Sequence, residues 1–147
     1  MIREATLNDI AQLSILFDEY RIFYEKESDL TGAEYFLKER LSNKESVIYI
    51  AVDSNNRFSG FVQMYPLFSS TKMKRLWLLN DLYVHAAHRG KGFGEALIER
   101  AKELAMATNA CGLMLETAKT NKIGNMLYKK TEWILDVDHN FYSWEIK

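Results

Sequence analysis

"YVHAAHRGKGFGEALIERAKELA", residues 83–105, is the stretch that decides the fold. Three glycines, Gly90, Gly92 and Gly94, stand at alternate positions between a basic cluster and an amphipathic run. Because glycine lacks a Cβ atom, the backbone at these positions can take positive φ and turn its N–H groups toward an anion. The run that follows carries apolar residues at helical spacing, namely Leu97, Ile98, Ala101, Leu104 and Ala105. The stretch predicts a turn from a strand into a helix whose positive N-terminal end holds an anion.

The spacing of the glycines excludes two familiar phosphate-binding loops. A P-loop requires G-x-x-x-x-G-K-[ST], and the chain has neither the second glycine nor the Lys-Ser/Thr pair at those offsets from Gly90. A dinucleotide fingerprint requires G-x-G-x-x-G, and Glu95 occupies its last position counted from Gly90. Arg89 and Lys91 add positive charge to the loop. The loop is therefore a site for another phosphate-bearing ligand or, as the alternative, a tight turn without a ligand.

The rest of the chain predicts a mixed sheet with helices on its faces. Alternating and β-branched segments predict strands, and apolar residues three and four apart predict helices. The expected strands are residues 2–6, 46–53, 58–68, 74–84, 112–117, 133–137 and 142–147, and the expected helices are residues 7–24, 31–43, 95–108 and 121–130. This order indicates an α/β (α+β) fold, and the length of the chain indicates one domain, residues 1–147.

Composition and charge narrow the class of protein. Hydrophobic residues make up 48% of the chain, which is enough to build a core. With 19 basic and 20 acidic residues, the net charge of −1 gives no reason to expect a nucleic acid or an anionic membrane as partner. The charged N-terminus is unlike a signal peptide, and no apolar run reaches membrane-spanning length. We therefore expect a cytoplasmic protein.

The cysteine and the histidines offer no catalytic or metal-binding pattern. Cys111 is the only cysteine and has no His-Asn or His-Asp context, so a covalent acyl-enzyme is disfavoured. His85, His88 and His139 have neither helical spacing nor a nearby carboxylate pattern for zinc. We expect no metal cofactor.

Two short sequence motifs, one in the glycine loop and one near residue 128, identify a family resemblance. Residues 89–94, RGKGFG, follow the pattern R/Q-x-x-G-x-G/A. Residues 121–133, NKIGNMLYKKTEW, follow N-x-x-A-x-x-L-Y-x-x-x-G-[FW] through Asn121, Leu127 and Tyr128. In these motifs and in its element order the chain resembles the GCN5-related N-acetyltransferase (GNAT) family over nearly its whole length.

The second motif departs from the family pattern at two positions. Gly124 stands where alanine is usual, which exchanges one small residue for another. Glu132 replaces the glycine before the aromatic residue, which bears on the turn into the last strands but leaves Tyr128 in register.

The resemblance implies a GNAT-like acyl-CoA N-acyltransferase fold with splayed central strands, and acetyl-CoA as cosubstrate. It implies that the loop grips the pyrophosphate, that backbone groups of Leu82, Tyr83 and Val84 at a bulge stabilise the oxyanion, and that Tyr128 protonates the leaving thiolate. The alternative for Tyr128 is a packed aromatic. The implied cofactor-binding residues are Leu82, Tyr83, Val84, Arg89, Gly90, Lys91, Gly92, Phe93, Gly94, Glu95, Asn121 and Tyr128.

Acyl transfer to an amine also needs a proton acceptor. An alkyl amine with a pKa of ~10.4 is almost fully protonated at pH 7. Asp81, on the strand that leads into the loop, is the candidate base, acting directly or through water. Its alternative role is to bind a substrate cation or to cap a backbone group. Glu116, on the next expected strand, is the second candidate base.

An amine pocket is expected between the first helices and the last strands. Aromatic residues from both regions would line it, namely Tyr20, Phe23, Tyr24, Phe141, Tyr142 and Trp144, with Asp29 or Asp138 holding a second cation. Core packing is the alternative explanation for these aromatics. Tyr24, Asp29 and Glu116 are the candidate substrate residues.

Two functions follow from these observations. The first is transfer of acetyl from acetyl-CoA to a primary amine by direct attack in a ternary complex. A small amine, polyamine or amino acid is the favoured acceptor, and a protein lysine or N-terminus is the competing one. The second function is a non-catalytic acyl-CoA-binding or sensing domain. The resemblance also implies a homodimer.

Overall fold

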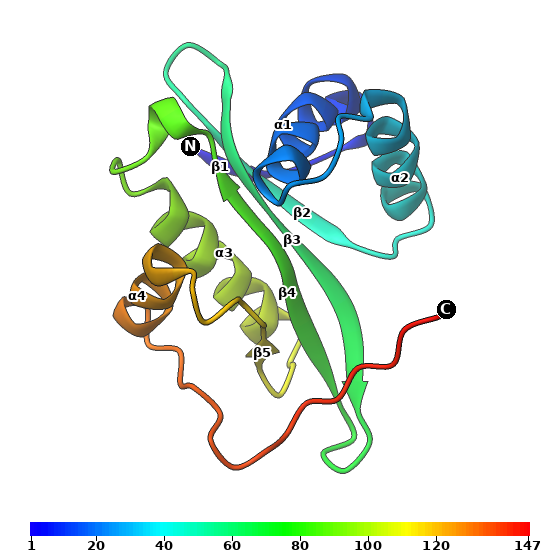
Figure 1. Ribbon diagram of the computed structural model, residues 1–147, viewed down its shortest axis with the longest axis vertical. Coiled ribbons are helices and arrows are strands. Elements are labelled where there is room, and N and C mark those ends of the chain that lie inside the picture. The colour runs from blue at the N-terminus through cyan, green and yellow to red at the C-terminus, as the bar shows by residue number, and fades with distance from the viewer. The chain divides into compact units, whose positions relative to one another are not determined.

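The computed structural model describes all 147 residues, which form two compact units, Met1–Glu116 and Thr117–Lys147 (Figure 1). The strands are β1 (Ile2–Glu4), β2 (Val47–Val52), β3 (Phe58–Ser69), β4 (Lys74–Val84) and β5 (Leu113–Met114), and the helices are α1 (Ile10–Phe23), α2 (Leu30–Ser42), α3 (Phe93–Ala107) and α4 (Lys122–Lys130). Short 3₁₀ turns, Leu7–Asp9 and Ala86–His88, precede α1 and α3. No helix is both long and apolar enough to cross a membrane.

The sheet of the first unit confirms the predicted mixed fold. Its strands follow the order β1-β2-β3-β4-β5, with antiparallel pairing from β1 to β4. The last strand, β5, runs parallel to β4 and pairs through only two residues, Leu113 with Trp77 and Met114 with Leu78. The strand predicted over residues 112–117 is therefore much shorter than expected, because β4 supplies partners for only two of its residues.

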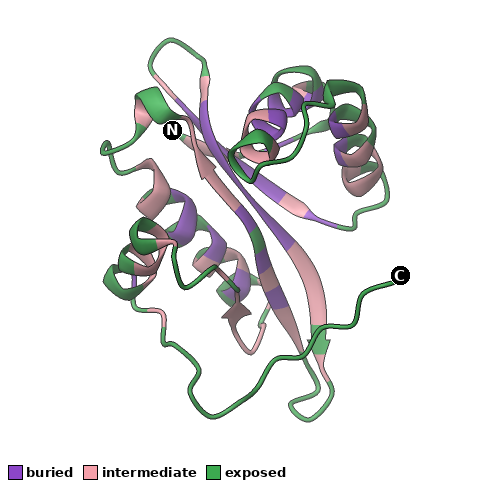
Figure 2. Ribbon diagram, viewed as in Figure 1, coloured by how far each residue is buried: buried purple, intermediate pink, exposed green.

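Helices cover both faces of this sheet. Figure 1 shows α1 and α2 on one side of strands β2 to β4 and α3 on the other. Buried residues gather on the middle strands and on the helix sides that face them (Figure 2). The core under α1 and α2 consists of Ala5, Ile10, Leu13, Leu16, Phe17, Ala33, Leu37, Ile48, Ile50, Val52 and Phe61. Burial of this apolar surface is the main force that holds the two helices on the sheet.

The connection between α1 and α2 is fixed by Asp18, a buried carboxylate on α1. Its Oδ2 accepts a hydrogen bond from the Ser28 hydroxyl (2.7 Å), and its Oδ1 accepts one from the Asp29 N–H (2.8 Å). These bonds hold the pKa of Asp18 below its usual value. Asp29 in turn caps α2, since its Oδ1 accepts from the Gly32 N–H at 2.9 Å. The turn predicted between the two helices is thus ordered by side-chain bonds.

The second unit contains α4, which begins at the Asn121 cap as predicted. Asn121 Oδ1 accepts from the Gly124 N–H at 3.1 Å. The helix ends at Lys130 with Thr131 as its C-cap, and Glu132 follows with a φ of 67°. This left-handed conformation favours glycine, which explains why the family pattern has glycine at the position of Glu132.

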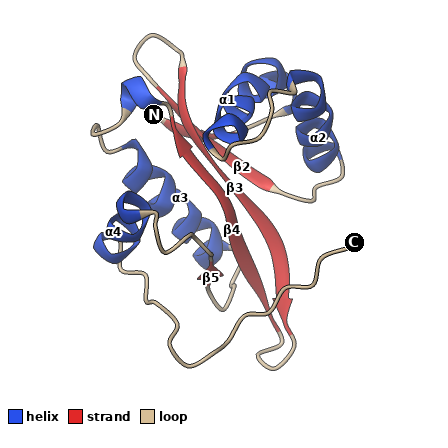
Figure 3. Cartoon of the chain, viewed as in Figure 1, coloured by secondary structure: helices blue, strands red, loops and turns tan.

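The closing strand pair predicted over residues 133–137 and 142–147 is wrong. Neither segment joins a sheet, and the chain after α4 is drawn as loop in Figure 3. Alternating apolar residues give a segment the capacity to form a strand, but a strand exists only when a neighbouring edge accepts its backbone hydrogen bonds. Within this chain no edge does so.

Candidate functional site

The glycine loop joins β4 to α3, as predicted. Gly90 and Gly92 have φ angles of 74° and 83°, and a Cβ atom added to either would meet nothing within 4 Å. Glycine is therefore required there by backbone conformation and not by crowding. The prediction of positive φ is wrong for Gly94. This residue lies in the first turn of α3 and has helical geometry.

The N-terminus of α3 points its first N–H groups toward this open space. The helix begins at Phe93, and its first backbone bond runs from the Ala96 N–H to the Gly92 carbonyl at 3.0 Å. The earlier N–H groups have no acceptor inside the helix. Glu95 also lies in this first turn, where only its N–H group, and not its carboxylate, suits an anionic ligand. The loop meets the requirements of an anion site.

The two basic residues of the loop lie differently. Arg89 Nε donates to the Val84 carbonyl at 2.9 Å, and its guanidinium lies over the ring of Phe23, 5.3 Å from the ring centroid. Arg89 therefore ties the loop back to β4 and α1. Lys91 is exposed and borders a cavity of about 340 Å³ together with His88 and Phe93. Lys91 is the cation of the loop whose side chain stays available to a phosphate.

The edge of β4 that faces β5 is open beside the loop. Pairing with β5 ends at Leu78, whereas Leu82, Tyr83 and Val84 keep regular pairing with β3 on the other edge. The open edge agrees with the splayed strands that the resemblance implied. The bulge, however, is not at Leu82–Val84, because the register shifts at Asn80, which has no partner on β3.

Gly60 is a structural residue that sequence reasoning missed. A Cβ atom added there would lie 2.6 Å from the Tyr83 carbonyl oxygen. Only glycine lets β3 approach β4 this closely at the end that leads into the loop.

Asp81 follows the bulge directly and is buried, with 5% of its surface exposed. Its Oδ2 accepts from Gln63 Nε2 at 2.7 Å, and its Oδ1 accepts from Asn80 Nδ2 at 3.1 Å. Gln63 Oε1 is buried and has no hydrogen-bond partner. Buried polar atoms of this kind are uncommon and call for an explanation. No local pattern marks Gln63, because its pairing with Asp81 depends on strand register.

Two tyrosines surround this carboxylate, and together with Asp81, Gln63 and Asn80 we name them the Asp81 network. Burial, with the neighbouring Asp81 charge and a hydrogen bond to it, raises the pKa of Tyr20 far above its usual value. Burial and the same charge raise the pKa of Tyr65 to about 12. Both hydroxyls therefore keep their protons at neutral pH, and that of Tyr20 acts as a donor to Asp81.

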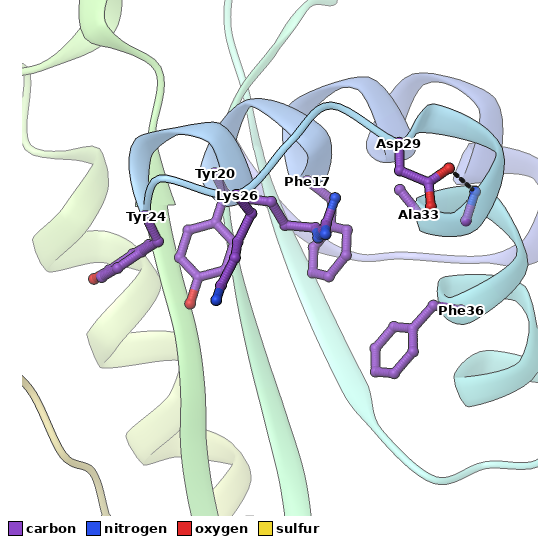
Figure 4. A pocket seen from close by; sticks show the side chains of 9 residues that line it. Phe17, Tyr20, Tyr24, Lys26, Asp29, Ala33 and Phe36 are labelled. Atoms are coloured by element: carbon purple, nitrogen blue, oxygen red, sulfur yellow. Dashed lines mark hydrogen bonds between the residues drawn. The ribbon is translucent and has the colours of Figure 1, made fainter.

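A cavity of about 480 Å³ lies between α1 and α2 (Figure 4), and Tyr20 of the Asp81 network is one of its lining residues. Tyr20 belongs to both, since its ring forms part of the cavity wall and its hydroxyl meets Asp81. Tyr20 and Tyr24 pack edge to face with ring centroids 5.0 Å apart. The lining residues of this α1–α2 cavity are Phe17, Tyr20, Arg21, Tyr24, Lys26, Asp29, Gly32, Ala33 and Phe36.

The structure brings two of the three candidate substrate residues together in this cavity. Tyr24 and Asp29 both line it, although Asp29 also caps α2. Glu116 is exposed beyond β5 and is not among the lining residues. The aromatics of residues 141–144 belong to the second unit, where the last strands on which half of the pocket was predicted do not form.

Asn121 and Tyr128 belong to the second unit. Both ends of the Asn121 amide are engaged there, because Oδ1 caps α4 and Nδ2 donates to the Thr117 hydroxyl at 2.9 Å. Tyr128 is half-buried on α4, and its ring packs edge to face against Trp133. A Cβ atom at Gly124 would clash with Asn121 Nδ2, so the glycine there leaves room for the cap.

The remaining candidates form no further site. Cys111 is a half-buried free thiol. His88 Nδ1 is 3.1 Å from the Ser59 hydroxyl, and His85 Nε2 is 3.7 Å from Glu19 Oε2. No group of three or more His, Cys, Asp or Glu side chains is placed to hold a metal ion.

A mixed sheet that opens beside a glycine turn and a helix N-terminus defines an α/β domain suited to a phosphate-bearing cofactor. Comparison with known proteins identifies the family. The model of the acetyltransferase (GNAT) family matches residues 13–133. The chain belongs to this family and is a GNAT-type acetyltransferase.

Individual relatives agree with this assignment. The chain is 45% identical to the uncharacterized N-acetyltransferase YhfO of Bacillus subtilis, over 96% of this chain and 94% of that protein. It is 33% identical to a probable acetyltransferase of Haemophilus influenzae, over 76% of each chain. A crystal structure of a probable acetyltransferase, 36% identical, matches with a TM-score of 0.96 over 100% of this chain and 98% of that one. The predicted family, fold and enzyme class are confirmed.

Proposed function

We propose that this acetyltransferase moves the acetyl group of acetyl-CoA to the primary amine of a small molecule bound in the α1–α2 cavity. The observation that carries the proposal is the position of Tyr20, which links that cavity to the buried Asp81 carboxylate. A cavity of about 480 Å³ is of a size to enclose a small molecule. A protein lysine or N-terminus would need a groove that holds the surrounding peptide, whereas a small molecule needs only a cavity of this size.

In this proposal Asp81 accepts the proton that the amine must lose. Gln63, Asn80 and Tyr20 donate hydrogen bonds to Asp81 and hold its carboxylate in one orientation. Gln63 Oε1 has no partner, so an N–H donor brought to Asp81 also meets a free carbonyl oxygen. A base fixed in this way needs little rearrangement when the proton moves.

The lining of the cavity favours an acceptor that carries a carboxylate as well as an amine. Two cationic side chains, Arg21 and Lys26, border it, whereas its one carboxylate, Asp29, is engaged in capping α2. The rings of Phe17, Tyr20, Tyr24 and Phe36 supply an apolar wall. Arg21 is paired with Asp18 at 3.6 Å, so Lys26 is the cation that a polyamine would meet. We infer an amino-acid-like acceptor, whose carboxylate would pair with Lys26.

The residues present fit acetyl-CoA, which supplies the acetyl group as a thioester. The glycine loop and the first turn of α3 offer N–H groups to the pyrophosphate, with Lys91 beside them. The open edge of β4 offers backbone groups of Leu82, Tyr83 and Val84 along the strand. The role of Tyr128 as proton donor and that of Asn121 in binding the cofactor stay predictions from the family motif.

The experiment that tests the function measures free thiol released from acetyl-CoA by the purified chain. Amino acids, polyamines, aminoglycosides and lysine peptides are offered separately, with Tyr20→Phe and Lys26→Ala beside the natural chain. Release with amino acids, and a raised KM for them in Lys26→Ala, supports the acceptor class. Release only with another group of acceptors contradicts it.

A binding measurement on the same samples distinguishes the enzyme from the alternative, a non-catalytic acyl-CoA-binding domain. Heat protection by acetyl-CoA without thiol release in any pool would favour a sensing role. Absence of protection would contradict the assignment of the glycine loop itself.

A further inference from the structure

We infer that the side chain of Arg89 positions the wall of the α1–α2 cavity, which the proposed function assigns to the acceptor, and is not a ligand of the phosphate. Its Nε atom donates to the Val84 carbonyl at 2.9 Å. The centre of its guanidinium lies 5.3 Å from the ring centroid of Phe23 and 5.8 Å from that of Tyr83. A lysine ammonium does not reproduce a guanidinium held over two rings. Arg89 therefore joins the start of the glycine loop to the end of α1.

The end of α1 has little core to hold it. The buried residues of this helix end at Asp18, and Tyr20 is the last one that packs against the core under α1 and α2. Phe23, the final residue of the helix, packs instead on Tyr83 of β4, with ring centroids 6.2 Å apart, and lies under Arg89. A cation beside a helix C-terminus also interacts favourably with the helix dipole. Arg89 and Tyr83 together hold the last turn of α1 against β4.

This end of α1 leads directly into part of the cavity wall. Tyr24 and Lys26 both line the cavity (Figure 4). Their backbone N–H groups both donate to the Arg21 carbonyl, at 3.1 and 3.0 Å. The ring of Tyr24 packs edge to face on that of Phe23, with centroids 5.3 Å apart. A displacement of Phe23 would therefore move two residues that the acceptor meets, although Phe23 itself is not among the lining residues.

A second contact links the same face of α1 to the residues between β4 and α3. Glu19 lies one turn before Phe23, so both side chains share one stripe of the helix. Glu19 Oε2 is 3.7 Å from His85 Nε2. Tyr20 and Tyr24 form the neighbouring stripe, which lines the cavity. The last turns of α1 thus contact the approach to the glycine loop on one side and the acceptor cavity on the other.

Lys91 provides the contrast within the loop. It borders a different cavity, of about 340 Å³, and is the cation proposed for the pyrophosphate. Arg89 and Lys91 are both positively charged and stand two residues apart, so charge alone would give them the same role. Their contacts separate them. Replacement of Lys91 should weaken the binding of acetyl-CoA, and replacement of Arg89 should weaken the binding of the acceptor.

The test compares Arg89→Lys with Lys91→Ala. Arg89→Lys keeps the positive charge but loses the planar group over Phe23 and Tyr83. With the amino acid that gives the fastest thiol release as acceptor, the KM for that amino acid should rise about fivefold, while the calorimetric affinity for acetyl-CoA stays within about twofold. Lys91→Ala should show the reverse pattern. If Arg89→Lys instead weakens acetyl-CoA and leaves the KM for the acceptor unchanged, the proposal is wrong.

Phe23→Leu tests the other side of the contact. It should raise the KM for the same amino acid, although Phe23 is not among the lining residues of the cavity. The double variant Phe23→Leu with Arg89→Lys should be no worse than the more impaired single variant, because both changes remove one contact. Fold-changes that multiply in the double variant would contradict a shared contact.

Hydrogen exchange separates this role of Arg89 from the proposed function, because it needs no acceptor. The amides of Tyr24, Glu25 and Lys26, which close the end of α1, should exchange about fivefold faster in Arg89→Lys than in the natural chain and in Lys91→Ala. If no amine is acetylated, the proposed function fails, and faster exchange still supports the hold of Arg89 on α1. Unchanged exchange at these amides overturns the proposal.

Discussion

The glycine loop and the Asp81 network both depend on β4, yet they are held in place by different parts of the chain. The loop is defined by its own backbone, with positive φ at Gly90 and Gly92 and open space around both. The Asp81 network is defined by side chains from α1, β3 and β4 that meet in a buried place. Local conformation therefore shapes the loop proposed for the cosubstrate, whereas tertiary packing positions the proposed base. Variants at the two places should fail in different ways.

The largest effect is expected from Asp81→Asn. The amide keeps the size of the side chain but cannot accept the proton, so kcat should fall at least about 100-fold. The affinity for acetyl-CoA should stay within about twofold, because the loop is untouched. Steady-state kinetics and calorimetric titration measure the two quantities.

Glu116→Gln decides between the two candidate bases. Glu116 is exposed and does not line the α1–α2 cavity, so this variant should lose far less than Asp81→Asn. If Glu116→Gln instead loses the larger part of kcat, the proposed role of Asp81 is wrong.

The next largest effect, on the affinity for acetyl-CoA, is expected at Gly92. Two variants there distinguish the need for positive φ from the need for open space. Gly92→Val places a β-branched residue at positive φ, and Gly92→Asn places a residue that tolerates this conformation. Acetyl-CoA should bind the valine variant about 10- to 100-fold more weakly than the natural chain and the asparagine variant only slightly more weakly. Equal losses in titration would mean that the open space, and not the turn, is what the ligand requires.

A smaller effect is expected from Gln63→Leu, which removes a donor from Asp81 at nearly constant volume. The carboxylate loses one of its fixed partners, so kcat should fall about 10-fold while the KM for acetyl-CoA changes little. A second variant, Gln63→Glu, keeps the shape but places a like charge beside Asp81 and should be less active than Gln63→Leu. The reverse order of activity would contradict an orienting role for this amide.

The smallest effect concerns Asp9, a carboxylate used for structure alone. Hydrogen bonds from Arg3 at 2.8 and 2.9 Å lower the pKa of Asp9 to about 2 from its ordinary value of 3.8. A pKa lowered by folding stabilises the folded state above the unfolded value, and this contribution is lost as the pH falls from about 4 through 2. Since Arg3 is partly exposed, the contribution should be about 1 kcal/mol at pH 7.

Urea unfolding of the natural chain and of Asp9→Asn at pH 7 and at pH 2.5 measures this contribution. The difference between the two chains should be largest at pH 7 and much smaller at pH 2.5, with turnover at pH 7 unchanged. Loss of turnover in Asp9→Asn would mean that Asp9 also contributes to activity and is not used for structure alone.

Much of the fold follows from local sequence pattern. The strand expected at residues 74–84 is β4 with the same bounds, and the helix expected at 95–108 is α3, which begins two residues earlier. Alternation and helical spacing are properties of neighbouring residues, so they survive in the folded chain. The turn at Gly90 and Gly92 was predictable for the same reason, since glycine is the residue for positive φ.

The errors lie where a residue depends on a partner that is distant in the chain. The bulge falls at Asn80 because β3 and β4 lose register there, and no pattern within β4 marks it. The last strands do not form because alternation cannot supply a neighbouring edge. The pairing of Gln63 with Asp81 needs both strands in place.

The sequence by itself determined the mixed fold, the glycine turn before α3 and the two motifs of the acetyltransferase family, because each is written in residues close together in the chain. Only the tertiary structure decided that Asp81 is buried, that Gln63 and Tyr20 hold it, and that Tyr24 and Asp29 share one cavity with Tyr20. These contacts join α1, β3 and β4 across long separations in sequence, and burial and strand register, which no single segment contains, bring them together.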